Sequence, residues 1–172
     1  LTWSVVENVP VHDAIKLHVG DHRRSTENYC ATIRNLGACG IDTVCYNFMP
    51  VLDWSRTAMR VERADGAIAT GFDPVAFATF DIHILCRPDA AESYTDDVRR
   101  TADAYHAGLS PDGIAALTET VLLGLPGSLE AFSLEGLRAA IARYAAVGEQ
   151  GLRAHLKEFL EHVVPGAREA GV

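Results

Sequence analysis

The chain has 172 residues, 48% of them hydrophobic, and carries a formal net charge of −8. This length suits one domain with a sizeable core. The negative charge argues against a nucleic-acid or anionic-membrane partner, because both need clustered Lys and Arg to displace counterions. No run of about 18 apolar residues, the length needed to cross a membrane, occurs in the sequence.

The cysteines indicate the redox compartment, and the two ends of the chain indicate whether it belongs to a longer fold. Four cysteines without CxxC spacing favour reduced thiols and a cytoplasmic location. They are Cys30, Cys39, Cys45 and Cys86. Leu1 opens directly on a strand-like run, and Val172 follows a helix stop. We therefore expect both ends to be cuts inside a longer fold.

The first third of the chain predicts a strand, a helix and a second strand. The strands cover 3–8 and 42–48, and the polar stretch 12–22, broken by Gly20, predicts a loop. Ser25 or Thr26 can cap the intervening helix. Its apolar positions have helical spacing and two glycines close it: Tyr29, Ile33 and Leu36, then Gly37 and Gly40. This pattern is a βαβ unit, which predicts parallel strands joined by a right-handed crossover.

The alternation of strands and helices then stops. Asp65-Gly66 between short extended arms predicts a hairpin over 60–69. Helices follow at 74–86, 95–107, 110–123 and 133–146, and a last helix at 149–170 has Pro165 as a kink or early boundary. The segment 59–146 therefore reads as a mainly helical insertion.

Two parallel strands cannot form a stable sheet alone, so further strands must lie elsewhere. The fold class expected is α/β, with residues 1–172 forming part of a (β/α)8 barrel domain. In such a barrel the insertion 59–146 would lie on the C-terminal face, where active sites are found.

Polar side chains gather where the two predicted strands end. Glu7 and Asn8 follow the first strand, and Tyr46 and Asn47 end the second. Because the ends of parallel barrel strands share one mouth, these residues are candidates for catalysis or substrate binding. The alternative is that Glu7 and Asn47 only hydrogen-bond loop backbone.

The histidines give a weaker signal. His12 could act as a general acid or contact a substrate, or it could be a solvated loop residue. His18 and His22 have the spacing of a helical metal-binding pair, but Gly20 between them argues against a helix. We expect no three side chains of this chain to converge on a metal. His83, His155 and His162 lie in apolar helical stretches and are interpreted as structural.

Asp53, Trp54 and Arg56 form the sharpest local constellation. A guanidinium grips a carboxylate with two hydrogen bonds, and an indole can cover the apolar face of a sugar. The alternative is an Asp53–Arg56 ion pair that only pins the loop. An acidic group elsewhere is interpreted as a solvated helix face: Glu92, Asp96, Asp97 and Asp103.

Four stretches carry a family resemblance: 3–12, 35–57, 80–85 and 124–127. With them the chain resembles the D-mannonate dehydratase family of xylose-isomerase-like barrels over essentially its whole length. The resemblance implies dehydration of D-mannonate to 2-keto-3-deoxy-D-gluconate in hexuronate breakdown. It also implies that the two strands are the second and third of the barrel, and that Mn2+ or Fe2+ is held by ligands beyond Val172.

Roles follow for the candidate residues under this resemblance. Glu7, His12 and Tyr46 are expected to handle protons. Substrate-binding roles are expected for Asn47, Asp53, Trp54 and Arg56. We expect a small sugar-acid substrate and a homo-oligomer. The alternatives are a related sugar isomerase or epimerase, and a non-catalytic partial barrel when the chain is isolated.

Overall fold

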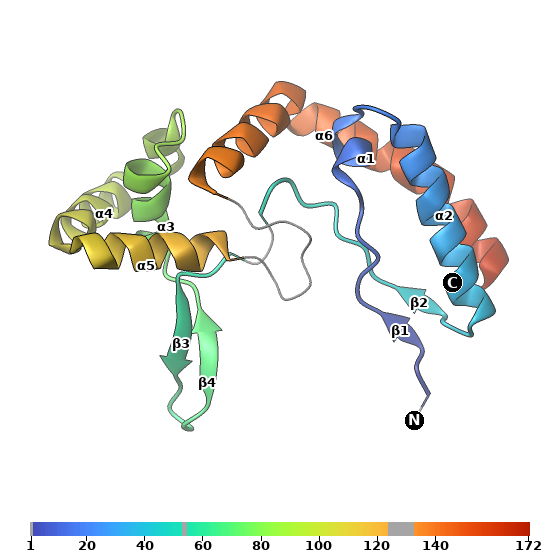
Figure 1. Ribbon diagram of the computed structural model, residues 1–172, viewed down its shortest axis with the longest axis horizontal. Helices are drawn as coiled ribbons and strands as arrows, with labels where there is room; N and C mark the ends of the chain where they lie inside the picture. The colour runs from blue at the N-terminus through green and yellow to red at the C-terminus, as the bar shows by residue number, and fades with distance from the viewer. Residues whose placement is uncertain (1, 53–54, 124–132) are drawn as a thin grey trace. The chain divides into compact units, whose positions relative to one another are not determined.

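The computed structural model describes residues 2–52, 55–123 and 133–172 (Figure 1). The chain forms two compact units: the first comprises Leu1–Pro50 with Ile141–Val172, and the second comprises Val51–Ala140. Among the described residues, no helix is long and apolar enough to cross a membrane.

The first unit is built on two parallel strands, β1 (Val5–Val6) and β2 (Thr43–Val44). Val5 pairs with Thr43 and Val6 with Val44, so the predicted parallel neighbours are confirmed. Both strands are shorter than the predicted 3–8 and 42–48. In the described part of the chain each has only one neighbour, and a strand paired on one side gains fewer ladder hydrogen bonds.

The predicted loop over 12–22 is wrong in part, because one helix lies inside this stretch and a second begins at its last residue. They are α1 (Asp13–Leu17) and α2 (His22–Ala38). His12 caps α1 by accepting a hydrogen bond from Ala14 N, and Asp21 caps α2 by accepting one from Arg24 N. Aspartate is a common capping residue, and with Asp21 as its cap α2 begins at His22, ahead of the predicted cap at Ser25 or Thr26.

The C-terminal part of the chain forms α6 (Leu134–Ala170), which contains two helical segments meeting at a kink. The kink is at Gly148, whose φ of 69° and ψ of 173° are not helical. This agrees with the prediction of separate helices over 133–146 and 149–170. Pro165 lies inside the second segment rather than ending it.

Gly148→Ala should lower the free energy of unfolding by about 1–3 kcal/mol, because this backbone region is open almost only to glycine. A Cβ at Gly148 would meet no atom within 4 Å, so crowding plays no part. Gly166→Ala is the matched control in the same helix, also with nothing within 4 Å, and it should gain about 0.5–1 kcal/mol. Urea unfolding checks both; equal effects would mean that the kink imposes no backbone constraint.

The core of the first unit joins α2 and α6 to the residues around the strands. Phe159 of α6 packs edge-on against Tyr29 of α2, with ring centroids 5.0 Å apart. The buried members of this core come from all parts of the unit: Val9, Val11, Ile15, Tyr29, Ile33, Phe159 and Val163. Val6 of β1 and Val44 of β2 pack against this core, so the helices cover one face of the strand pair.

Burial within this core raises the pKa of Tyr29 to about 12, and Tyr46 and Cys30 add to the shift. The unfolded chain, with a tyrosine pKa of about 10, loses this proton more readily than the folded one. The stabilisation is therefore complete below pH 10 and is lost as the pH rises through about 12.

Tyr29→Phe keeps the ring and removes this titration. Its melting temperature should fall less steeply than that of the wild type between pH 10 and pH 12. Tyr105→Phe, at an exposed side chain, is the control and should follow the wild-type curve. If Tyr29→Phe also follows that curve, burial of this hydroxyl does not set alkaline stability.

The second unit opens with the predicted hairpin, which is confirmed. Strands β3 (Ala58–Glu62) and β4 (Ile68–Gly71) pair antiparallel around a turn in which Gly66 has a φ of 81°. The predicted helices follow as α3 (Pro74–Thr79), η1 (Phe80–Ile84), α4 (Asp96–Gly108) and α5 (Pro111–Leu122), and a short 3-10 helix that was not predicted, η2 (Ala90–Ser93), lies between η1 and α4. The predicted helix 74–86 is divided, because the chain widens into the π-helix η1 after Thr79. The place of 59–146 on a barrel face stays a prediction.

Candidate functional site

The structure brings the ends of the two parallel strands together. Cys45 N donates to Val6 O at 3.0 Å, and Val9 N donates to Cys45 O at 3.4 Å. These bonds flank Glu7 and Asn8, which places their backbone beside Cys45. Four candidates sit at this edge: Glu7 and Tyr46 are exposed, whereas Asn8 and Asn47 are half-buried. Their chemical roles stay predictions.

Tyr46 also has a packing role. Its ring centroid lies 6.0 Å from that of Phe159, and the side chain is still 42% exposed. Aromatic pairs at such separations stabilise a fold. Substitution of the whole ring would therefore disturb the core, and only Tyr46→Phe isolates the hydroxyl.

His12 is exposed and its ring orientation is fixed by the cap of α1. Its Nδ1 accepts a hydrogen bond from Ala14 N at 3.0 Å. In the neutral imidazole the proton must therefore be on Nε2. This arrangement leaves Nε2–H as a donor that could protonate a leaving group.

Arg56 is the most unusual candidate of the second unit. The residue is only 9% exposed, and its Nη2 has no hydrogen-bond partner among the residues that the structure describes. The next residue pins the backbone, because Thr57 N donates to Gly71 O and Thr57 Oγ1 accepts from Asp73 N. A buried cation without a partner is costly. The geometry therefore favours an anionic partner for Arg56.

Asp53 and Trp54 lie outside the described residues. The alternative of an Asp53–Arg56 ion pair, and the substrate contacts expected of Asp53 and Trp54, stay predictions.

We expected no three side chains of this chain to converge on a metal, but three potential ligand residues lie close together in the structure. His18, His22 and Glu158 each offer one ligand atom, and these atoms lie within 4.8 Å of one another. Gly20 does exclude a helical pair, as expected, but the turn between α1 and α2 stacks the two imidazoles with centroids 4.5 Å apart. His155 of α6 also stacks on His18, with ring centroids 3.5 Å apart.

The environment of this cluster favours a neutral His18. Burial lowers the pKa of His18, and His155 and His22 lower it further, while Glu158 opposes them. The carboxylate of Glu158 is 3.8 Å from His18 Nε2. Because metal ions bind neutral imidazole, this environment keeps His18 in its ligand form near neutral pH.

The strand-end residues do not make a metal site by themselves. They provide one carboxylate, Glu7, and one imidazole, His12, whose Nδ1 is used as a cap. Over residues 2–52, 55–123 and 133–172, the group of potential ligands is His18, His22 and Glu158 instead. A metal at the strand ends would need donors from outside the described residues.

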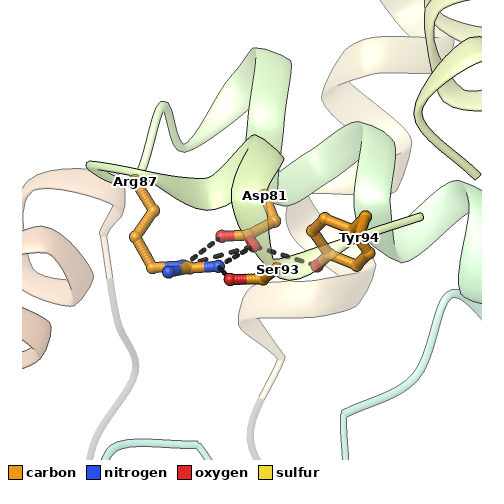
Figure 2. Close-up of polar contacts among 4 residues, drawn as sticks. All are labelled: Asp81, Arg87, Ser93 and Tyr94. Atoms are coloured by element: carbon orange, nitrogen blue, oxygen red, sulfur yellow. Dashed lines mark hydrogen bonds and ion pairs between the residues drawn. The ribbon is translucent and has the colours of Figure 1, made fainter. Parts of the chain in front are cut away.

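The second unit contains a buried polar network that the sequence reading missed (Figure 2). Asp81, 5% exposed, accepts from Arg87 Nε at 2.9 Å, from Arg87 Nη2 at 2.7 Å and from Tyr94 OH at 2.9 Å. Hydrogen bonding to Asp81 raises the pKa of Arg87 against the effect of burial. Burial, then the bond to Asp81, raises the pKa of Tyr94 to about 12. Both carboxylate oxygens are occupied, so this network is structural.

The remaining polar predictions concern histidines and the acidic face. His83 Nε2 lies 2.9 Å from Asp103 Oδ1, His155 Nδ1 lies 2.8 Å from Lys16 O, and His162 Nδ1 lies 3.0 Å from Glu158 O. These contacts agree with structural roles. The predicted acidic face is exposed throughout: Glu92, Asp96, Asp97 and Asp103.

Comparison with known proteins places this geometry in context. A family model described as D-mannonate dehydratase (UxuA) matches residues 1–172. A mannonate dehydratase of Marinomonas sp. (strain MWYL1) is 45% identical over the whole chain, and one of Chromohalobacter salexigens is 48% identical. The chain spans 44% of the length of each.

A solved structure is also similar. The crystal structure of mannonate dehydratase from Streptococcus suis serotype 2 matches 98% of the chain, with a TM-score of 0.59 and 29% sequence identity. The match covers 34% of that protein.

Proposed function

We propose that the protein containing this chain removes water from D-mannonate, because the chain belongs to the D-mannonate dehydratase family. The product would be 2-keto-3-deoxy-D-gluconate, formed in hexuronate breakdown. The observation that carries the proposal is the family match over all 172 residues. Because the chain spans less than half of its curated relatives, the activity is proposed for the longer protein.

The first unit would contribute two strands of a (β/α)8 barrel. The parallel pairing of β1 and β2 across the helical crossover supports this arrangement. In the barrel these would be the second and third strands, with 59–146 inserted on the C-terminal face. The strand ends with Glu7, Asn8, Tyr46 and Asn47 would then border the active site.

The reaction sets clear demands on these residues. A base must take the weakly acidic C2 proton of the sugar acid, and an acid must protonate the hydroxide that leaves C3. Glu7 and Tyr46 are exposed at the joined strand ends, and His12 presents a protonated Nε2. We assign proton handling to these three residues, with His12 as the acid.

A divalent metal, Mn2+ or Fe2+, would stabilise the enolate-like charge that develops on the substrate. The strand ends of this chain supply too few donors for such an ion. The family resemblance implies that its ligands would lie beyond Val172.

Substrate binding is assigned to the loop after β2. The orphan Nη2 of the buried Arg56 supports a contact with the substrate carboxylate. Asn47, half-buried at the strand end, would accept or donate to a hydroxyl, with Asp53 and Trp54 as further contacts. We also propose a homo-oligomer in the cytoplasm.

Incubating the full-length protein with D-mannonate, once with Mn2+ and once with Fe2+, tests this function. Mass analysis should show a product lighter than the substrate by one water. A sugar isomerase or epimerase would give a product of unchanged mass. Complete inactivity with either metal would leave the non-catalytic alternative and reject the dehydratase.

A further inference from the structure

The cluster of His18, His22 and Glu158 has free donor atoms. In the described residues the two imidazoles make no hydrogen bonds through their ring nitrogens, apart from the 3.8 Å approach of His18 to Glu158. The cations beside Glu158 on α6 are occupied, since Arg153 pairs with Glu149 and Lys157 with Glu161. No other ion pair to Glu158 exists in the described part of the chain. The cluster therefore presents two nitrogen lone pairs and one uncommitted carboxylate.

Two backbone features bring the cluster together. His18 ends α1 in the left-handed region with a φ of 52°, and Gly20 follows with a φ of 55°. This tight turn lets His22, the first residue of α2, stack on His18. Glu158 then approaches from the second segment of α6, which the core residue Phe159 anchors.

His155 stacks on the His18 ring and limits its rotation. Its Nδ1 donates to Lys16 O at 2.8 Å, which fixes the ring of His155. The two rings are nearly parallel, 10° apart, with centroids separated by 3.5 Å. His155 is a positioning residue and not a ligand, because its ring stacks on His18 and it is not one of the three residues whose ligand atoms lie together.

The donor set selects a class of ion. Imidazole nitrogens with one carboxylate suit borderline divalent metals such as Zn2+, whereas Mg2+ and Ca2+ prefer oxygen donors throughout. Two histidines, one glutamate and a water make a familiar four-coordinate zinc shell. Ligands about 2.1 Å from a tetrahedral ion lie about 3.4 Å apart. The three ligand atoms lie within 4.8 Å of one another. To reach that spacing, the rings of His18 and His22, which are stacked 11° from parallel, would turn so that a nitrogen of each faces the ion.

We propose that His18, His22 and Glu158 bind one borderline divalent metal ion, with Zn2+ as the best match. The ion joins the turn between α1 and α2 to α6. It thereby fastens together elements that are more than a hundred residues apart in sequence. This site is built from residues that the proposed dehydration does not use.

Zn2+ titration of the full-length protein, after removal of metals with a chelator, tests the proposal. Isothermal calorimetry should show one ion fewer per chain for His18→Ala, His22→Ala and Glu158→Gln than for the wild type. If a variant still binds that ion, the dissociation constant of this one site should be more than about tenfold higher than in the wild type. Co2+ serves as a second probe. In each variant, the Co2+-loaded protein should lack the visible absorption that one four-coordinate Co2+ ion contributes in the wild type.

Two control variants change the same residue types at positions on α6, the helix that carries Glu158. His162→Ala removes an exposed imidazole of α6 and Glu161→Gln an exposed carboxylate, and both variants should bind as many ions as the wild type. His155→Ala should retain the ion with a dissociation constant raised about 10- to 100-fold. Glu158→Gln preserves shape at an exposed position, so its result stands even if a histidine variant fails to fold.

Zn2+ stoichiometry and affinity within about twofold of the wild type in Glu158→Gln and His22→Ala would overturn the proposal. Binding of this ion only at millimolar Zn2+ would also overturn it. Neither outcome bears on dehydration of D-mannonate, which is measured separately by product mass.

Discussion

Asp81→Ala should lower the free energy of unfolding by about 3 kcal/mol, the low end for breaking a buried ion pair. The carboxylate side chain is 7% exposed and receives three hydrogen bonds from Arg87 and one from Tyr94. Removing it leaves the Tyr94 hydroxyl without this acceptor and leaves the Arg87 guanidinium with the hydrogen bond from Nη2 to Ser93 Oγ at 3.1 Å (Figure 2). The Arg87 side chain is 28% exposed, so water can partly solvate it, which keeps the cost from being larger. Urea unfolding of the full-length protein measures the change.

Asp103→Ala is the matched control in the same unit. Asp103 also meets a basic partner, His83 at 2.9 Å, but its side chain is 65% exposed. Exposed pairs contribute about 0–1 kcal/mol. Equal losses for the two variants would show that burial of Asp81 does not set the cost.

Arg56→Lys should lower catalytic efficiency on D-mannonate about 10- to 100-fold, at an almost unchanged melting temperature. A planar guanidinium grips a carboxylate with two parallel hydrogen bonds, and an ammonium cannot reproduce this pairing. Losing one charge-assisted bond costs about 1.5–3 kcal/mol. The unpartnered Nη2 explains why stability should change little, since the described structure contains no hydrogen bond from that atom to lose. Steady-state kinetics and a thermal melt of the full-length enzyme give both quantities.

Arg60→Lys is the control for this substitution. Arg60 is an exposed residue of β3, four positions further along, and its replacement should leave efficiency within about twofold. If Arg56→Lys behaves like this control, or if its melting temperature falls along with its activity, Arg56 is a residue that pins the loop and does not bind substrate.

Features set by neighbouring residues could be predicted from the sequence. The Asp65-Gly66 hairpin and the starts of α4 and α5 near residues 95 and 110 follow local patterns. The order of strand, helix and strand predicted the parallel pairing of β1 with β2. The same local patterns predicted the strands too long, because strand length depends on neighbours that the pattern does not contain.

Features set by distant residues could not be predicted. Glu158 reaches His18 and His22 only because α6 packs on the turn between α1 and α2. The fully used carboxylate of Asp81 likewise depends on how η1 and the following chain fold back. Even the local cap by His12 was missed, because histidine is not among the usual capping residues.

Dehydration of D-mannonate in D2O, followed by proton and carbon NMR, tests the proposed function most directly. The full-length protein should remove the C2 proton and expel the C3 hydroxide. The enol formed would then take one solvent deuteron at C3 as it becomes the 2-keto product. We expect a keto carbon at C2 and a single deuterium on the new methylene at C3. A product that keeps every hydroxyl and carries deuterium at C2 would contradict dehydration and indicate an epimerase.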